Sequence, residues 1–205
     1  MKTTCIAPRS CAPLLAVLLP LLLAGCANGG PGSVACAALE AAGLRKPAPL
    51  PEAQQPPRRI ALQLHAAPRL NLDARGQPLA LLVRVLELRQ RAAFEQAPYA
   101  AFLSPQAERE ALGADLLESR EVMLVPGRRL NLDESLAREA GWLGVVALYH
   151  SPAPQGWRLA FAAADAERSG ITIGLHACAL SVGAGAAAYG AGGAGVKPLP
   201  LVRCQ

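Results

Sequence analysis

The stretch "RRIALQLHAA", residues 58–67, decides the fold. Its large apolar side chains stand at every second position, at Ile60, Leu62 and Leu64, and smaller or polar residues stand between them. Because successive side chains of a strand point to opposite faces, this period predicts a half-buried β-strand. The following run "LALLVRVLELRQ" (79–90) is almost continuously apolar, which predicts a strand at the centre of a sheet.

Further strand patterns recur at short intervals along the rest of the chain. Turn signals separate them at Pro126-Gly127, "SPAPQG" and "DAERSG", and the Gly-rich segment 183–196 is predicted to be a flexible hairpin loop. Together with the strands predicted at 58–67 and 79–90, these strand patterns predict an all-β fold, an antiparallel β-sandwich of about eight strands. The expected strands are 120–125, 128–133, 142–150, 156–163, 171–182 and 200–204.

Residues 91–117 interrupt this pattern with a short helical insertion. Ser104 is a suitable N-cap, Pro105 suits the first helical position, and Gly113 is a typical C-terminal stop. The alanine-rich segment around them predicts two or three short helical pieces packed on a sheet.

The N-terminus has the pattern of an export signal. Lys2 and Arg9 precede an apolar run that is shorter than the roughly 20 residues of a membrane-spanning helix. The run ends in "LAGC", residues 23–26, which resembles the bacterial lipobox. That resemblance implies cleavage before Cys26 and covalent lipid on its thiol and new amine. An ordinary signal peptide with an incidental cysteine is the alternative.

These features divide the chain into three parts. Residues 1–25 are the predicted lipoprotein signal peptide, 26–57 a lipidated, Gly- and Pro-rich tether, and 58–205 the β-sandwich domain. Ala27 stands where lipoproteins of the inner membrane often carry aspartate, so the sorting rule implies the outer membrane.

Charge excludes one class of function. Without residues 1–25 the chain carries 18 basic and 15 acidic residues, too small and dispersed an excess for nucleic-acid binding. The pairs Arg58–Arg59 and Arg128–Arg129 are expected at solvated strand ends. A solvated helix face is expected for the carboxylates Glu108, Glu110, Asp115 and Glu118.

The cysteines favour one structural bond. Cys178 and Cys204 lie on the last two predicted strands, and a disulfide between them would contribute roughly 3 kcal/mol in an oxidising compartment. Cys36 is left over, free or paired elsewhere.

No constellation for catalysis, metal binding or a cofactor emerges. His65, His150 and His176 are on three separate predicted strands, without metal-ligand spacing. His176 and Cys178 would share a strand face, but no orienting group or oxyanion hole accompanies them. "GAGAAA" (183–188) matches a relaxed dinucleotide motif without the strand–turn–helix context it needs. We therefore expect no enzyme, no metal, and no cofactor beyond the lipid on Cys26.

The order of these elements resembles one family. Lipobox and tether are followed by "LNLDARGQPLALLVRVLELRQRAAFEQAPYAAF" (70–102), "LGADLLESREVMLVPGR" (112–128) and "WLGVVALYH" (142–150). Over residues 58–182 the chain is similar to the outer-membrane lipoprotein of the type VI secretion system, the TssJ (SciN) family. Position 72 is often proline in relatives, and the Gly-rich C-terminal loop is not universal.

The resemblance implies a transthyretin-like sandwich without enzymatic activity. It implies an anchor at the outer membrane that binds the periplasmic domain of the inner-membrane component TssM. The contact would come from the loop between the first two strands, Ala67 to Pro78. Its candidate partner-binding residues are Arg69, Leu70, Asn71, Leu72, Asp73, Ala74, Arg75, Gly76 and Gln77.

Within this loop, we expect Arg69, Asp73 and Arg75 to supply polar contacts and Leu70 and Leu72 to serve as apolar anchors. Two other classes compete. A sandwich lipoprotein that binds a small ligand or cell-wall fragment would need exposed aromatic residues along a cleft. An anchored periplasmic enzyme would need a convergent catalytic set.

Overall fold

The computed structural model describes residues 51, 54–190, 193–194 and 204. The predicted signal peptide, Cys26, Cys36 and the tether up to residue 50 lie outside the described residues. None of the helices in the described part of the chain has the length and apolar character that a membrane crossing requires.

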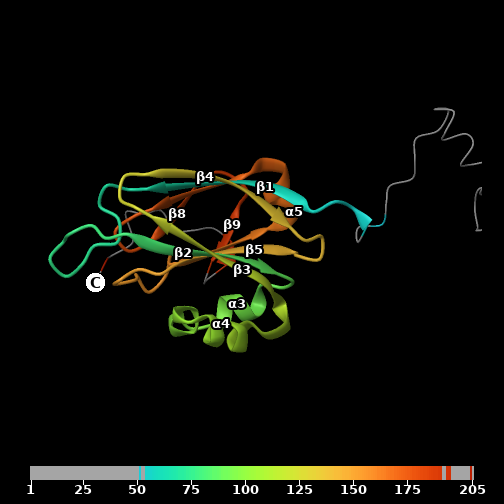
Figure 1. The fold of residues 1–205 in the computed structure, drawn as a ribbon, viewed down its shortest axis with the longest axis horizontal. Helices are drawn as coiled ribbons and strands as arrows, with labels where there is room; N and C mark the ends of the chain where they lie inside the picture. Colours follow the sequence, from blue (N-terminus) through green and yellow to red (C-terminus); the bar gives the residue numbers. More distant parts are fainter. Residues whose placement is uncertain (1–50, 52–53, 191–192, 195–203, 205) are drawn as a thin grey trace, which may run out of the picture. The chain divides into compact units, whose positions relative to one another are not determined.

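Two sheets pack face to face in the unit Pro51–Gln205 (Figure 1). One sheet has the strand order β4-β1-β7-β8, and the other has the order β10-β9-β6-β5-β2-β3. The strands are β1 (Arg58–Ala66), β2 (Leu81–Leu88), β3 (Leu116–Leu124), β4 (Arg129–Leu136), β5 (Trp142–Ala147), β6 (Arg158–Ala162), β7 (Ile171–Leu175), β8 (Leu180–Gly185), β9 (Ala188–Gly190) and β10 (Gly193–Ala194).

The two strands that anchored the prediction are confirmed. β1 alternates between buried and exposed positions because one of its faces covers the core. β2 lies between β3 and β5, and most of its side chains are buried. Its odd positions, such as Val83 and Val85, face the other sheet, whereas Arg84 and its even-numbered neighbours face the helical insertion.

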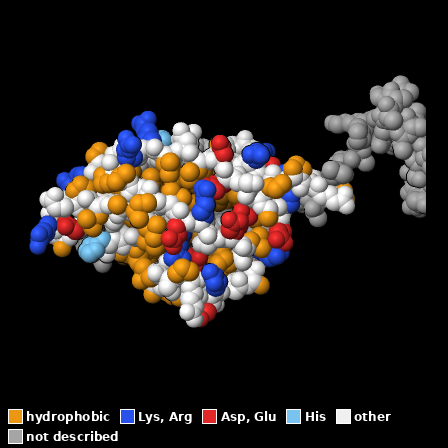
Figure 2. Space-filling model, in the orientation of Figure 1, with side chains coloured by type: hydrophobic (Ala, Val, Ile, Leu, Met, Phe, Trp, Pro, Cys, Tyr) orange, Lys and Arg blue, Asp and Glu red, His pale blue; other side chains and the backbone are white. Residues whose placement is uncertain are grey.

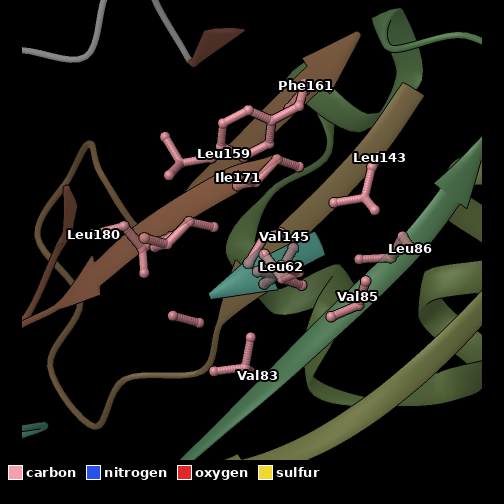
Figure 3. Close-up of a cluster of buried hydrophobic side chains, with 14 of the residues drawn as sticks. Leu62, Val83, Val85, Leu86, Leu143, Val145, Leu159, Phe161, Ile171 and Leu180 are labelled. Atoms are coloured by element: carbon pink, nitrogen blue, oxygen red, sulfur yellow. The ribbon is translucent and has the colours of Figure 1, made fainter. Parts of the chain in front are cut away.

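The core fills the space between the sheets (Figure 3). Leu62, Ile171 and Leu180 come from the four-stranded sheet and meet side chains such as Val145 and Leu159 from the six-stranded sheet. All five are at most 1% exposed. At about 25 cal/mol per Å² of buried apolar surface, this layer supplies the main driving force for folding.

The helical insertion covers the outer face of the six-stranded sheet. It contains α3 (Ala92–Gln96), α4 (Pro105–Leu112) and the 3₁₀ turns Tyr99–Leu103 and Gly113–Asp115. As predicted, Ser104 caps α4, its Oγ accepting a hydrogen bond from Ala107 N at 3.1 Å, and Gly113 ends it. Phe94 packs over Gly144 of β5, where a Cβ would stand 3.1 Å from the ring.

Glu108 of α4 is not on a solvated face, contrary to the expectation. It is 1% exposed and forms an ion pair with Arg84 of β2 at 2.9 Å, and Arg84 also pairs with Glu121. The sequence could not show this, because a buried carboxylate needs a cation from an element distant in the chain.

The C-terminal third departs most from the predicted pattern. The expected strand 171–182 is two strands, β7 and β8, joined by the turn 176–179. "DAERSG" is mostly helical: α5 (Ala163–Ser169) carries the chain from β6 across to the other sheet. β7 therefore lies parallel to β1, whereas every other named strand pair is antiparallel.

The Gly-rich segment is also more regular than predicted. After β8 the chain changes sheet, and β9 pairs with β6 while β10 pairs with β9. The prediction of one hairpin loop is therefore wrong, because the segment contains the end of β8 and the antiparallel pair β9 and β10. The predicted strand 200–204 lies outside the described residues except for Cys204.

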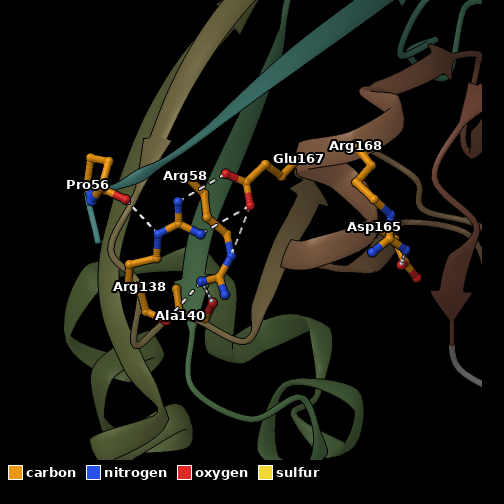
Figure 4. Close-up of polar contacts among 7 residues, drawn as sticks. All are labelled: Pro56, Arg58, Arg138, Ala140, Asp165, Glu167 and Arg168. Carbon is orange, nitrogen blue, oxygen red and sulfur yellow. Dashed lines mark hydrogen bonds and ion pairs between the residues drawn. The ribbon is translucent and has the colours of Figure 1, made fainter. Parts of the chain in front are cut away.

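An ion-pair cluster fastens the end of the sandwich at which β1 begins (Figure 4). Arg58 donates hydrogen bonds to the carbonyl oxygens of Arg138, at 2.8 Å, and Ala140, at 3.3 Å, and its Nε lies 3.4 Å from Glu167. Arg138 pairs with the same carboxylate. Arg58 is buried, so its assignment to a solvated strand end was wrong, whereas Arg59 is exposed.

Candidate partner-binding site

The segment between β1 and β2 forms a loop at the opposite end of the sandwich (Figure 1). Its residues divide into a buried base and an exposed tip. Leu70 is fully buried and Asn71 is 5% exposed. Arg69 and residues 74–78 are exposed, and Leu72 and Asp73 are half-buried.

Asn71 fixes the base of the loop. Its φ of 47° lies in the left-handed region, which asparagine tolerates better than most residues. Its Nδ2 donates to Ala80 O at 2.8 Å, and its Oδ1 accepts from His150 N at 2.7 Å. One buried side chain thus ties the loop to the start of β2 and to the segment after β5.

The turn between β7 and β8 supports the same base. Asn71 N donates to His176 O, and Leu72 N donates to Ala177 O, each at 3.2 Å. Cys178 of this turn forms a disulfide with Cys204, with a Cα–Cα distance of 5.6 Å. The Cys178 carbonyl oxygen accepts a hydrogen bond from Ala153 N, so the turn is linked to a third segment as well.

The tip is held by the carboxylate of Asp73. Its Oδ1 accepts hydrogen bonds from the backbone N–H groups of Arg75 and Gln77, both at 2.8 Å. Gly76 adopts a φ of 75°, which only glycine takes without strain, and Leu72 bridges to Pro78. The tip is therefore ordered before any partner arrives, which lowers the entropic cost of binding.

The structure changes the roles available to the predicted residues. Leu70 lies in the core, so it cannot anchor a partner as expected. One carboxylate oxygen of Asp73 already accepts hydrogen bonds within the tip itself. The side chains free to meet a partner are those of Arg69, Arg75 and Gln77.

Sequence reasoning missed the structural role of Asn71. The available signal was an asparagine in a loop near a predicted strand, since asparagine is enriched at positive φ. That signal is weak without the partner groups on Ala80 and His150, which come from other elements.

The structure removes the pair of His176 and Cys178 as a catalytic candidate. Cys178 is in a disulfide and lies with His176 on a turn instead of a strand face. Burial lowers the pKa of His176, whose Nε2 lies 2.8 Å from Ser181 Oγ. In the described part of the chain, no group of three or more histidine, cysteine, aspartate or glutamate residues could hold a metal ion.

The aromatic side chains speak against a ligand cleft. None of them is exposed: five are buried, and Tyr99, Trp142 and Tyr189 are half-buried. Fold and site together define a class of protein: a β-sandwich with an ordered, exposed loop between β1 and β2.

Comparison with known protein families identifies the family of this chain. Residues 58–178 match the family of type VI secretion lipoproteins (VasD, EvfM, TssJ), to which this chain belongs. The family consists of structural outer-membrane lipoproteins of the type VI secretion system and not of enzymes. No curated protein matches the sequence at a significant level.

Solved structures of type VI secretion proteins are similar to this chain in sequence and fold. The crystal structure of the lipoprotein TssJ1 from Pseudomonas aeruginosa is 35% identical, with a TM-score of 0.57 over 63% of this chain and 97% of that one. A chain of a type VI membrane complex is 25% identical (TM-score 0.56, 61% and 97% covered). A chain in a structure of the TssM C-terminal domain from EAEC is also 25% identical (TM-score 0.53, 61% and 97% covered).

Proposed function

We propose that this chain holds the type VI secretion membrane complex at the outer membrane, and that its loop 67–78 binds the periplasmic domain of TssM. The observation that carries the proposal is the division of the loop into a buried base and an exposed, internally bonded tip. Binding specificity is commonly placed on such loops, because a rigid scaffold positions them. The relatives found in a membrane complex and with TssM support the choice of partner.

The membrane attachment in this proposal is lipid on Cys26. Each buried methylene contributes about 0.8 kcal/mol, and stable anchoring takes more than one acyl chain. The exported Cys26→Ser chain should therefore leave the outer-membrane fraction and become soluble in the periplasm. Retention in the outer membrane would contradict the anchor.

The buried base determines which loop variant tests the partner. Deleting residues 70–77 would remove Leu70 and Asn71 from the interior and unfold the neighbourhood of the loop. Replacing only the exposed tip, residues 74–77, with Gly-Ser-Gly-Ser keeps the chain length and the base.

The test is capture of the TssM periplasmic domain by the exported Cys26→Ser chain. We expect the tip replacement to weaken capture at least tenfold while the circular dichroism spectrum stays unchanged. Arg109→Ser/Glu110→Ser on exposed positions of α4 is the control and should bind like the parent chain. Undiminished capture by the tip variant would refute the loop assignment.

A further inference from the structure

The arginines of the described residues fall into two groups. Most of those on the body of the sandwich are neutralised, Arg59 and Arg109 being exceptions among the described residues. The ion pairs are Arg58 and Arg138 with Glu167, Arg84 with Glu108, Arg89 with Glu139, Arg91 with Glu95, Arg120 with Glu134 and Arg168 with Asp165. Buried Arg158 donates to the carbonyl oxygens of α3. Of the arginines that remain exposed without an ion pair among the described residues, four belong to one end of the molecule: Arg69, Arg75, Arg128 and Arg129.

Tertiary structure brings these four together from two segments. Arg69 and Arg75 belong to the partner-binding loop. Arg128 ends the β3–β4 turn, which bonds to the start of that loop, and Arg129 is the first residue of β4. Ala66 N donates to Arg128 O at 2.9 Å, and Gly127 N donates to Ala67 O at 3.2 Å. Basic side chains gather at this end in Figure 2.

The four arginines Arg69, Arg75, Arg128 and Arg129 form a basic patch with few acidic groups nearby to neutralise it. Within segments 65–79 and 125–130 the one acidic residue is Asp73, whose Oδ1 already accepts two backbone hydrogen bonds. Four like charges on one exposed end repel one another, whereas most arginines elsewhere in the described structure pair with a carboxylate. An unneutralised patch of this kind attracts an anionic surface and speeds association with it.

We propose that Arg69, Arg75, Arg128 and Arg129 form the electrostatic half of the partner-binding surface, and that they receive an acidic patch on the TssM periplasmic domain. The inference rests on the proposed function. It extends the contact from the loop to the β3–β4 turn. The four-residue tip, 74–77, is small beside the roughly 800 Å² that each partner of a stable complex buries, so a second segment is needed.

Continuity with the partner-binding loop favours a protein partner over anionic lipid. Arg69 and Arg75 lie on that loop, and hydrogen bonds of Arg128 and Gly127 join the neighbouring turn to its start. The nine residues of β1 separate the patch from Arg58 by about 30 Å.

The experiment measures association of the exported Cys26→Ser chain with the TssM periplasmic domain in 50 mM and 500 mM NaCl. Arg69→Gln/Arg75→Gln and Arg128→Gln/Arg129→Gln each remove two charges from the patch. Arg59→Gln/Arg109→Gln is a matched control, because it removes two exposed, unpaired arginines from elsewhere. Anionic phospholipid vesicles serve as the second ligand.

Each patch double variant should lower the association rate constant about tenfold at low salt, with the difference shrinking below twofold at high salt. The control should match the parent chain. If the parent binds TssM and the Arg128/Arg129 variant binds equally well, the inference is overturned while the proposed function stands. Failure of the parent to bind would overturn the proposed function itself. Loss of vesicle binding in the variants, with TssM binding intact, would assign the patch to lipid and overturn the inference.

Discussion

The two ends of the sandwich use arginine in opposite ways. Where β1 begins, Arg58 and Arg138 both form ion pairs with Glu167 of α5. Both also donate hydrogen bonds to backbone carbonyl oxygens. These contacts join the start of β1 to α5 and to the 137–140 turn. Where β1 ends, Arg69 and Arg128 are exposed and have no carboxylate partner among the described residues. The first end stabilises the domain, and the second is the end that we propose for partner binding. Three sets of variants test this division.

Removal of the disulfide should have the largest effect. Cys178→Ala/Cys204→Ala releases a cross-link between residues 26 apart, and loop-closure entropy predicts a loss of about 3–4 kcal/mol in the free energy of unfolding. Because the 176–179 turn accepts hydrogen bonds from Asn71 and Leu72, binding of TssM should weaken as well. Urea unfolding of the oxidised chain measures the loss. An unchanged midpoint would show that the bond carries no stability.

A smaller loss should follow at the end where β1 begins. Arg58→Ala removes the bonds to two carbonyl oxygens and the contact with Glu167, and should cost about 2–3 kcal/mol by urea unfolding. Binding of TssM should not change. Arg59→Ala, its exposed neighbour, should stay within about 0.5 kcal/mol of the parent chain. If the Arg58→Ala chain is fully folded and still binds TssM more weakly, the separate roles assigned to the two ends are wrong.

The smallest effect on stability should come from Asn71. Asn71→Ala loses the bonds to Ala80 and His150 and puts at positive φ a residue that tolerates it less well than asparagine, for a cost of about 2 kcal/mol. Asn71→Gly keeps the backbone conformation and should cost less. Both should weaken TssM binding several-fold because the loop base is released. Equal stability of the two variants would show that the left-handed conformation is not under strain.

Prediction from sequence succeeded where the signal was local. β1 and β2 were found from the spacing of their own side chains, and α4 from Ser104, Pro105 and Gly113. It failed at the turn 176–179, because the run "ITIGLHACALSV" is apolar on both sides of the turn and carries no proline or double glycine to mark it. The parallel pairing of β1 with β7 depends on the crossover through α5, which has no counterpart in a local pattern.

The sequence by itself determined the class of fold, the place of the loop and the pattern of a lipid anchor at Cys26, because alternation, capping residues and the lipobox each act over a few neighbouring positions. Only the tertiary structure decided which charged side chains are neutralised in ion pairs. Burial of Arg58 and Glu108 requires partners on distant elements, and placing Arg69 and Arg128 at the same end requires the β3–β4 turn to bond to the start of the loop. The energy of a charge depends on its surroundings, and those are set by the fold and not by the neighbours in sequence.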